Sequence, residues 1–284
     1  MRKISLGLIL TAAATLGCGD STGSGAARLT VTVTDAPIDI LESATVQIGD
    51  VEIIPAEGAP VLLTSDGGTH DLLALQNGVT GNVASLEIEA GRYLQLRLVV
   101  QSASVTLKEG FEFNDGSRVK DLVVPSGAQS GIKINLDASD GDANNAGINI
   151  SPGETILVID FDVSQNFKVQ GNADTPAGIN GFLFTPLLRA VVRDVAGSIA
   201  GTLTGESVQG ITVTAEQTES GLQEALQTAT ATALTDATGA YTIRFLAPGT
   251  YTVTVEGRTA TPTNQSITVG AAESVTAVDF SVSQ

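Results

Sequence analysis

The stretch "TDATGAYTIRFLAPGTYTVTV", residues 235–255, decides the fold of the C-terminal part of this chain. Apolar and polar residues alternate on both sides of Pro248, which is typical of two half-buried strands. Asp236 and Gly239 fit a tight hairpin turn before the first strand, with the glycine at a positive φ. Pro248 and Gly249 fit the second and third positions of a type II turn. The stretch therefore predicts antiparallel strands whose connections are set by glycine and proline.

Short strands of the same kind continue on both sides of this stretch, and a change of pattern near Asp194 marks a domain boundary. The C-terminal unit, residues 195–284, is predicted to contain seven strands. We expect them at residues 198–203, 211–216, 228–234, 240–245, 250–256, 265–269 and 275–282.

The region before the boundary, residues 29–194, is also rich in strands. Five segments alternate with a period of two, and glycine, asparagine, aspartate and proline separate them. These segments are residues 29–35, 44–53, 93–100, 132–136 and 156–163. One short helical turn is expected at residues 70–78. The predicted class is therefore all-β, with two β-sandwich domains.

Both regions resemble known families. Residues 195–284 resemble the carboxypeptidase regulatory-like family, which implies a seven-stranded prealbumin-like Greek-key sandwich in a carbohydrate-binding-like fold group. Residues 29–194 resemble a bacterial domain of unknown function found in lipoproteins. The resemblance is carried by "LTVTVTDAPID", "HDLLALQNG", "EAGRYLQLRLVV", "ILVIDFDVSQNF" and "FTPLLRAVV". Neither resemblance implies an established activity.

The amino-terminal segment reads as a secretory leader. Two basic residues precede the apolar run "ISLGLILTAAATL", which is too short to span a membrane. The next small residue, Gly17, is followed by Cys18, the only cysteine. This boundary resembles the lipobox of bacterial lipoproteins, although Thr15 stands where leucine is usual. The resemblance implies a signal peptide at residues 1–17, acylation of Cys18 by lipid chains such as palmitate, and a flexible tether at residues 18–28.

The charge of the chain excludes one large class of partners. Fourteen basic and 31 acidic residues give a net charge of −17, and no basic stripe is present. A polyanion would be repelled, so we expect no nucleic-acid partner. No glycine-rich dinucleotide or phosphate loop follows a strand, so no cofactor is predicted.

A metal site has one candidate. With a single histidine and an acylated cysteine, the chain lacks the ligands of a structural zinc site. The loop "DASDGDANNAG" supplies closely spaced oxygen ligands that suit calcium. Its candidate ligands are Asp137, Asp140, Asp142 and Asn144. The glycine and terminal glutamate of a helix–loop–helix site are replaced by Asn145 and Ser151, so a solvated turn is the simpler interpretation.

The best catalytic candidate is a pair of carboxylates, Asp160 and Asp162, in "VIDFDV". On one strand face they would lie about 6–7 Å apart, close to the separation in inverting glycosidases. However, Ile159 and Phe161 already explain a half-buried strand with the acids on its wet side. A Ser-His-Asp triad would need His70, which stands at the entry of the predicted helical turn with Asp71 as its cap. We therefore predict no catalytic residues and no enzyme.

These features together predict a lipoprotein of the bacterial cell envelope, anchored in a membrane and facing the periplasm or the cell surface. Its expected role is that of a non-catalytic binding or adhesion module for a glycan or an envelope protein. The alternative is a spacer that displays or braces other envelope components. An exposed aromatic cluster of Tyr93, Tyr241 or Tyr251 would favour glycan binding, whereas buried tyrosines would favour the spacer.

Overall fold

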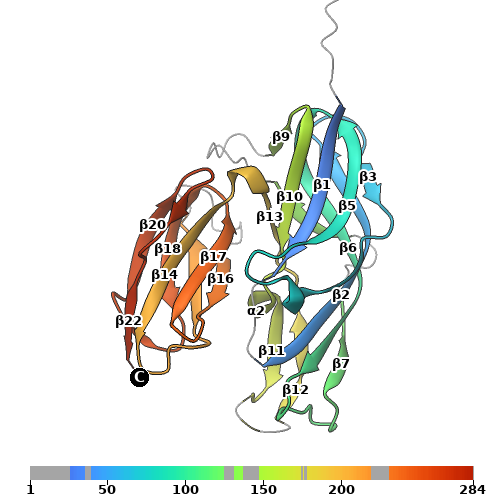
Figure 1. Ribbon diagram of the computed structural model, residues 1–284. Helices are drawn as coiled ribbons and strands as arrows, with labels where there is room; N and C mark the ends of the chain where they lie inside the picture. The colour runs from blue at the N-terminus through green and yellow to red at the C-terminus, as the bar shows by residue number, and fades with distance from the viewer. Residues whose placement is uncertain are drawn as a thin grey trace, which may run out of the picture.

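The computed structural model describes residues 26–35, 40–124, 131–136, 147–173, 175, 178–218 and 230–283. Within these ranges the chain is all-β and forms two β-sandwich domains that lie side by side (Figure 1). The helical elements are short: η1 (Leu72–Leu75), α2 (Val163–Asn166) and η2 (Arg193–Val195). None of the described helices has the length and apolar character needed to cross a membrane.

One sheet of the N-terminal domain contains strands from both ends of the domain. Its order is β13-β10-β1-β5, in which β1 runs parallel to β10 and antiparallel to β5. Its strands are β1 (Ala26–Thr34), β5 (Gly81–Glu89), β10 (Gly153–Asp160) and β13 (Arg189–Val192). Because β1 lies between two partners, the amino-terminal strand is held along both edges.

The facing sheet is built around two long strands, with the order β3-β2-β6-β7. Strand β4 also pairs with β2, and β8 and β9 also pair with β6. The bounds are β2 (Leu41–Pro55), β3 (Val61–Thr64), β4 (Gly68–Asp71), β6 (Gly91–Leu107), β7 (Val119–Leu122), β8 (Ile132–Asn135) and β9 (Ile148–Ile150). A separate hairpin follows, of β11 (Phe167–Gly171) and β12 (Ile179–Phe184).

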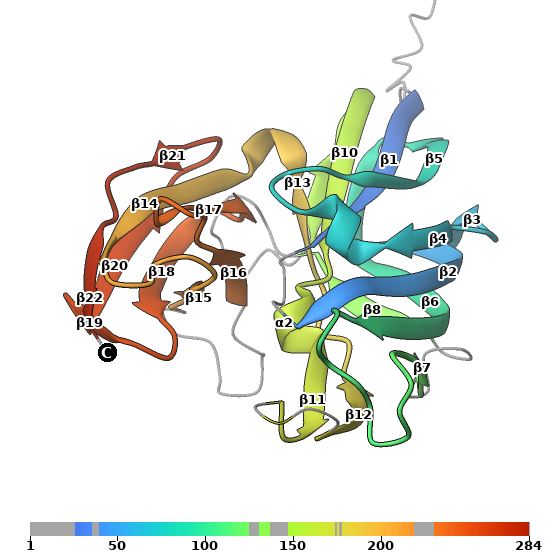
Figure 2. The same cartoon turned by 60° about the horizontal axis from the view of Figure 1, so that its bottom comes forward.

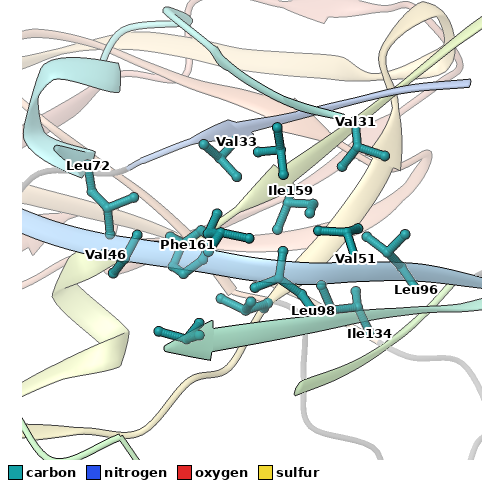
Figure 3. Packing of buried hydrophobic residues seen from close by; sticks show 14 of the residues in the cluster. Val31, Val33, Val46, Val51, Leu72, Leu96, Leu98, Ile134, Ile159 and Phe161 are labelled. Atoms are coloured by element: carbon teal, nitrogen blue, oxygen red, sulfur yellow. The ribbon is translucent and has the colours of Figure 1, made fainter. Parts of the chain in front are cut away.

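The core of the N-terminal domain fills the space between its two sheets. Val31 and Val33 from β1 and Ile159 from β10 point toward Val51 on β2 and Leu98 on β6, and all five are fully buried (Figure 3). Removing this apolar surface from water is the main favourable contribution to folding. The alternation seen in the sequence therefore places one face of each strand in this core.

The C-terminal domain is a smaller sandwich with its own core. One sheet has the order β17-β14-β22-β19, with β21 also paired to β14, and the other has the order β16-β15-β18-β20. The first contains β14 (Gly197–Gly205), β17 (Ala240–Leu246), β19 (Thr259–Thr261), β21 (Ser274–Val275) and β22 (Phe280–Ser283). The second contains β15 (Thr212–Gln217), β16 (Thr230–Leu234), β18 (Gly249–Val255) and β20 (Asn264–Val269).

Most predicted strands are confirmed, with differences at their ends, but several strands of the N-terminal domain were not predicted, among them β3, β4, β5 and β7. Strand β10 stops at Asp160 instead of continuing to Val163, where α2 begins. The expected last strand is split into β21 and β22, and the short β19 was not anticipated. Strand β1 begins at Ala26, inside the expected tether, because Ala27 is fully buried and pairs with both neighbouring strands.

Of the two turns predicted in the opening stretch, one is confirmed. Gly239 has a φ of +81°, and the Asp236 carboxylate accepts hydrogen bonds from the backbone N–H of Ala240 and from Thr238. The Thr238 hydroxyl and these amides hold the pKa of Asp236 below its usual value. This local network explains why aspartate and glycine specify the hairpin.

The second turn prediction is wrong. Gly249 is not among the residues with positive φ and is already the first residue of β18, paired with Val269. The positive φ before the connection belongs to Phe245, at +54°. The register between β14 and β17 shifts in the segment that includes Phe245, and Gly249 is not the third residue of a type II turn.

Candidate functional site

Acidic side chains gather where the parallel strands β1 and β10 end. Since both strands run in the same direction, their carboxyl ends lie at one edge of the sheet and bring Asp35 close to Asp160 and Asp162. The Asp35 carboxylate accepts a hydrogen bond of 2.7 Å from the backbone N–H of Val163. Residues more than 120 positions apart thus meet at this edge.

The expectation that Asp160 and Asp162 lie on a wet face is wrong. Their exposed fractions are 6% and 3%. Asp162 follows the end of β10, where its φ of +31° turns the chain and its N–H donates to the Asp160 carboxylate. Val158 and Val191 are also buried without belonging to either domain core. This end of the sheet is therefore covered on both faces, and Arg189 and Asp162 contact the C-terminal domain there.

Arg189 links the two domains from strand β13. The antiparallel register of β10 and β13 places it directly opposite Asp160. Its Nη2 donates to the Asp160 carboxylate, and its Nη1 donates to the backbone carbonyl of Phe245 at 2.6 Å. The side chains of Arg189 and Asp160 are only 19% and 8% exposed. A shielded guanidinium therefore balances a buried carboxylate and reaches the C-terminal domain at the same time.

Asp162 makes the second cross-domain contact. Its carboxylate accepts hydrogen bonds from the Ser164 hydroxyl at 2.5 Å and from the Thr232 hydroxyl of β16 at 3.1 and 3.2 Å. Burial and the nearby Asp160 carboxylate raise the pKa of Asp162 to about 7, although Ser164, Arg189 and Thr232 lower it. Figure 2 shows α2, which includes Ser164, on the side of the N-terminal domain that faces β16.

Asn166 fixes the backbone that carries Asp162. It is fully buried, and its amide nitrogen donates to the Asp162 carbonyl at 3.1 Å. Its side-chain oxygen accepts a hydrogen bond from the backbone N–H of Leu187. These bonds tie the turn after β10 to the segment before β13, so Asp162 and Arg189 are held in one rigid unit.

A small cavity of about 30 Å³ lies between the domains. It is lined by Thr34, Asp35, Asn77, Gly78, Asp160 and Arg189 from the N-terminal domain and by Thr232, Ala233, Leu234, Thr242, Arg244 and Phe245 from the C-terminal domain. This volume accommodates about one or two water molecules. Pockets for organic ligands are typically about 300–1,000 Å³. The cavity is therefore part of a polar joint and does not have the size of a substrate site.

The other sequence-predicted sites have simpler roles or lie elsewhere. His70 lies on β4, where its Nε2 is 2.8 Å from the Gly67 carbonyl, and Asp71 caps η1 by accepting from the N–H of Leu73, as predicted. Cys18 and the calcium candidates Asp137, Asp140, Asp142 and Asn144 lie outside the described residues. Within the described part of the chain, no three His, Cys, Asp or Glu side chains are grouped to hold a metal ion.

The three tyrosines are buried, with exposed fractions of 3% for Tyr93, 4% for Tyr241 and 2% for Tyr251. Their hydroxyls donate to backbone carbonyls at 2.6–2.7 Å. The described residues include every aromatic side chain of the chain, and none of the phenylalanines is exposed. Sugar rings usually stack on exposed aromatic faces, so the described surface offers no such platform.

Sequence reasoning missed most of the joint, namely Asp35, Ser164, Arg189 and Thr232. One signal was available, because Arg189 is the only charged residue in the apolar closing segment "FTPLLRAVV". An isolated arginine in a strand indicates a buried partner. Which residue is the partner of Arg189 depends on the register between β10 and β13, and periodicity alone does not determine that register.

Family comparisons cover nearly all of the described chain. The model of a family described as "Domain of unknown function (DUF4382)" matches residues 26–184. The carboxypeptidase regulatory-like domain matches residues 194–283. No curated protein sequence matches the chain.

Solved structures overlap with the chain only loosely. The Bacillus anthracis TIE protein is 10% identical, with a TM-score of 0.25; 92% of this chain is covered, and the chain spans 35% of that protein. GBS52, the minor pilin of Streptococcus agalactiae, is 10% identical, with a TM-score of 0.22 and coverages of 90% and 96%. The tip fimbrial protein Mfa3 of Porphyromonas gingivalis is 8% identical, with a TM-score of 0.16 and coverages of 86% and 81%. TM-scores of this size do not establish a common fold.

Proposed function

Since this chain belongs to the DUF4382 family and continues into a carboxypeptidase regulatory-like domain, we propose that it is a lipid-anchored spacer of the bacterial cell envelope. In this role the two sandwiches hold or brace other envelope components at a distance from the membrane, without catalysis. The observation that carries the proposal is the burial of every tyrosine, which was the condition that favours a spacer over a glycan-binding module.

The way the chain enters the fold supports a role in bearing load. The tether leads into β1, which is paired along its length with β10 on one side and β5 on the other. A pull on an anchor at Cys18 is therefore transmitted to a strand held by two rows of hydrogen bonds. An edge strand, with one row, would resist such a pull less well.

The joint between the domains supports the same role. Arg189 and Asp162 each contact the C-terminal domain from positions held within the N-terminal domain. Only four residues, the three of η2 and Ala196, separate β13 from Gly197, the first residue of β14. A short connection with shielded polar contacts restricts the relative movement of two domains more than a long flexible linker does.

Replacing Cys18 with serine is expected to abolish lipid attachment, because the thioether that carries the lipid forms on the sulfur. Labelled palmitate fed to cells should mark the wild type and leave Cys18→Ser unlabelled, with the variant released into the soluble fraction. Thr15→Leu, which restores the usual lipobox residue, should be labelled at least as well as the wild type. Equal labelling of wild type and Cys18→Ser would contradict the anchor.

The spacer role predicts that the full chain carrying Cys18→Ser retains no glycan class on a glycan array. A photo-crosslinker introduced at the exposed Glu206 in cells should join the anchored protein to an envelope protein. Saturable binding to one glycan class would instead support the alternative, a glycan-binding adhesion module. Absence of any crosslinked protein from a series of exposed C-terminal positions would contradict bracing.

A further inference from the structure

We propose that the Asp162–Thr232 contact is a proton-operated latch that closes the joint between the two domains in acid and lets it loosen as the pH rises. The latch goes beyond the spacer role, because it makes the stiffness of the molecule depend on its surroundings. It concerns the joint alone, so its test does not depend on the lipid anchor or on any envelope partner.

A latch of this kind needs a titratable group that contacts both domains, and Asp162 is such a group. Asp162 is 3% exposed, and its carboxylate receives hydrogen bonds from Ser164 in its own domain and from Thr232 in the other. The two hydroxyls are also 3.2 Å apart. A hydroxyl can donate to a carboxylate or accept from a carboxylic acid, so the contact is compatible with both protonation states. What differs between the states is the cost of keeping a charge away from water.

The latch also needs a group whose ionisation is opposed while the joint is closed. The Asp160 carboxylate opposes ionisation of Asp162, and the Arg189 guanidinium favours it. Arg189 is itself the ion-pair partner of Asp160. Asp35 lies beside the same turn, since its carboxylate accepts a hydrogen bond from the Val163 N–H. Burial and the neighbouring Asp160 carboxylate therefore favour a proton on Asp162.

The direction of the pH effect follows from the hydration of Asp162, which differs between the closed joint and separated domains. If the domains separate, Thr232 leaves and the carboxylate becomes hydrated, so its pKa returns toward the ordinary value of about 4. In the closed joint its pKa is raised to about 7. The closed state therefore binds the proton more tightly. The extra stability that this proton gives to the closed joint is full below about pH 4, declines between pH 4 and 7, and is absent above that range.

The Arg189 contact with the Phe245 carbonyl does not involve Asp162 and remains when the latch is ionised. The expected change is therefore a looser joint and not a separated pair of domains. Between pH 5 and pH 8 the equilibrium constant for closing should fall by about 10-fold or more.

The test measures the distance between the domains by pulsed electron paramagnetic resonance. Spin labels are placed at Leu62→Cys on β3 and Glu206→Cys after β14, both exposed, in the full chain carrying Cys18→Ser. The wild-type distance distribution should be narrow at pH 5 and broader at pH 8. In Asp162→Asn it should stay narrow at both values, because asparagine keeps the shape, lacks the charge and tolerates the positive φ. Asp194→Asn, an exposed acid in η2, should keep the wild-type response.

A pH-independent distribution in the wild type, or an unchanged pH response in Asp162→Asn, would overturn the latch. Thr232→Val keeps the inference testable if the asparagine variant does not fold. Valine removes a donor to the ionised carboxylate, so the joint should loosen more at pH 8 while it remains narrow at pH 5. A response identical to the wild type in this variant would equally overturn the latch.

Discussion

Replacing Arg189 with alanine is expected to cost about 3–5 kcal/mol of unfolding free energy, because it leaves a buried carboxylate without its counter-charge. Asp160 is only 8% exposed at its side chain, and Arg189 is its ion-pair partner across the β10–β13 register. The same substitution removes the donor to the Phe245 carbonyl, so contact between the domains weakens as well. Urea denaturation followed by circular dichroism measures the loss.

A surface ion pair provides the matched control for Arg189→Ala. Arg28 and Glu87 are 3.1 Å apart on neighbouring strands, but their side chains are 50% and 67% exposed. Water and salt screen such a pair, so Arg28→Ala should cost less than about 1 kcal/mol. The double variant Asp160→Asn/Arg189→Met should recover much of the lost stability, because it removes both charges. Equal losses in Arg189→Ala and Arg28→Ala would show that the Arg189 pair is not shielded as described.

Gly201→Val is expected to be the most damaging single change in the C-terminal domain, with a loss above about 3 kcal/mol. Gly201 lies in the middle of β14, opposite Tyr241. A Cβ atom at this position would come within 1.9 Å of the Val278 carbonyl oxygen and 3.0 Å of the Tyr241 hydroxyl. That carbonyl accepts the Tyr241 hydrogen bond, so the backbone cannot move aside without breaking it. Domains of this size have about 5–10 kcal/mol of stability in total.

Gly257 is the control for this prediction, because its φ is +67° but no atom lies within 4 Å of an added Cβ. Gly257→Ala should therefore cost only about 1–2 kcal/mol, through backbone strain alone. Gly201→Ala carries the same steric conflict as the valine variant and should still cost more than Gly257→Ala. Chemical denaturation of these variants decides the order, and a smaller loss in Gly201→Ala would show that β14 does not approach residue 278 this closely.

The all-β class, the two sandwiches and the positions of the strands with clear alternation follow from local sequence, whereas strands such as β3, β5 and β7 were not predicted. The alternation of Leu29, Val31 and Val33 predicts both a strand and its buried face, because side chains on a strand alternate with a period of two. Asp236 and Gly239 specify their hairpin through contacts within four residues. Such features require no knowledge of distant parts of the chain.

The joint was decided by tertiary structure. Sequence alternation placed Asp160 and Asp162 on a wet face, yet both are buried in the fold. They lie where β1 pairs with β10, Arg189 lies opposite Asp160, and Thr232 of the C-terminal domain contacts Asp162. Likewise, the positive φ expected at Gly249 lies at Phe245 instead. Periodicity reports which residues share a face of one strand, but what covers that face depends on register and domain contacts between residues far apart in sequence. Burial, and with it the pKa of Asp162, is therefore a property of the assembled fold.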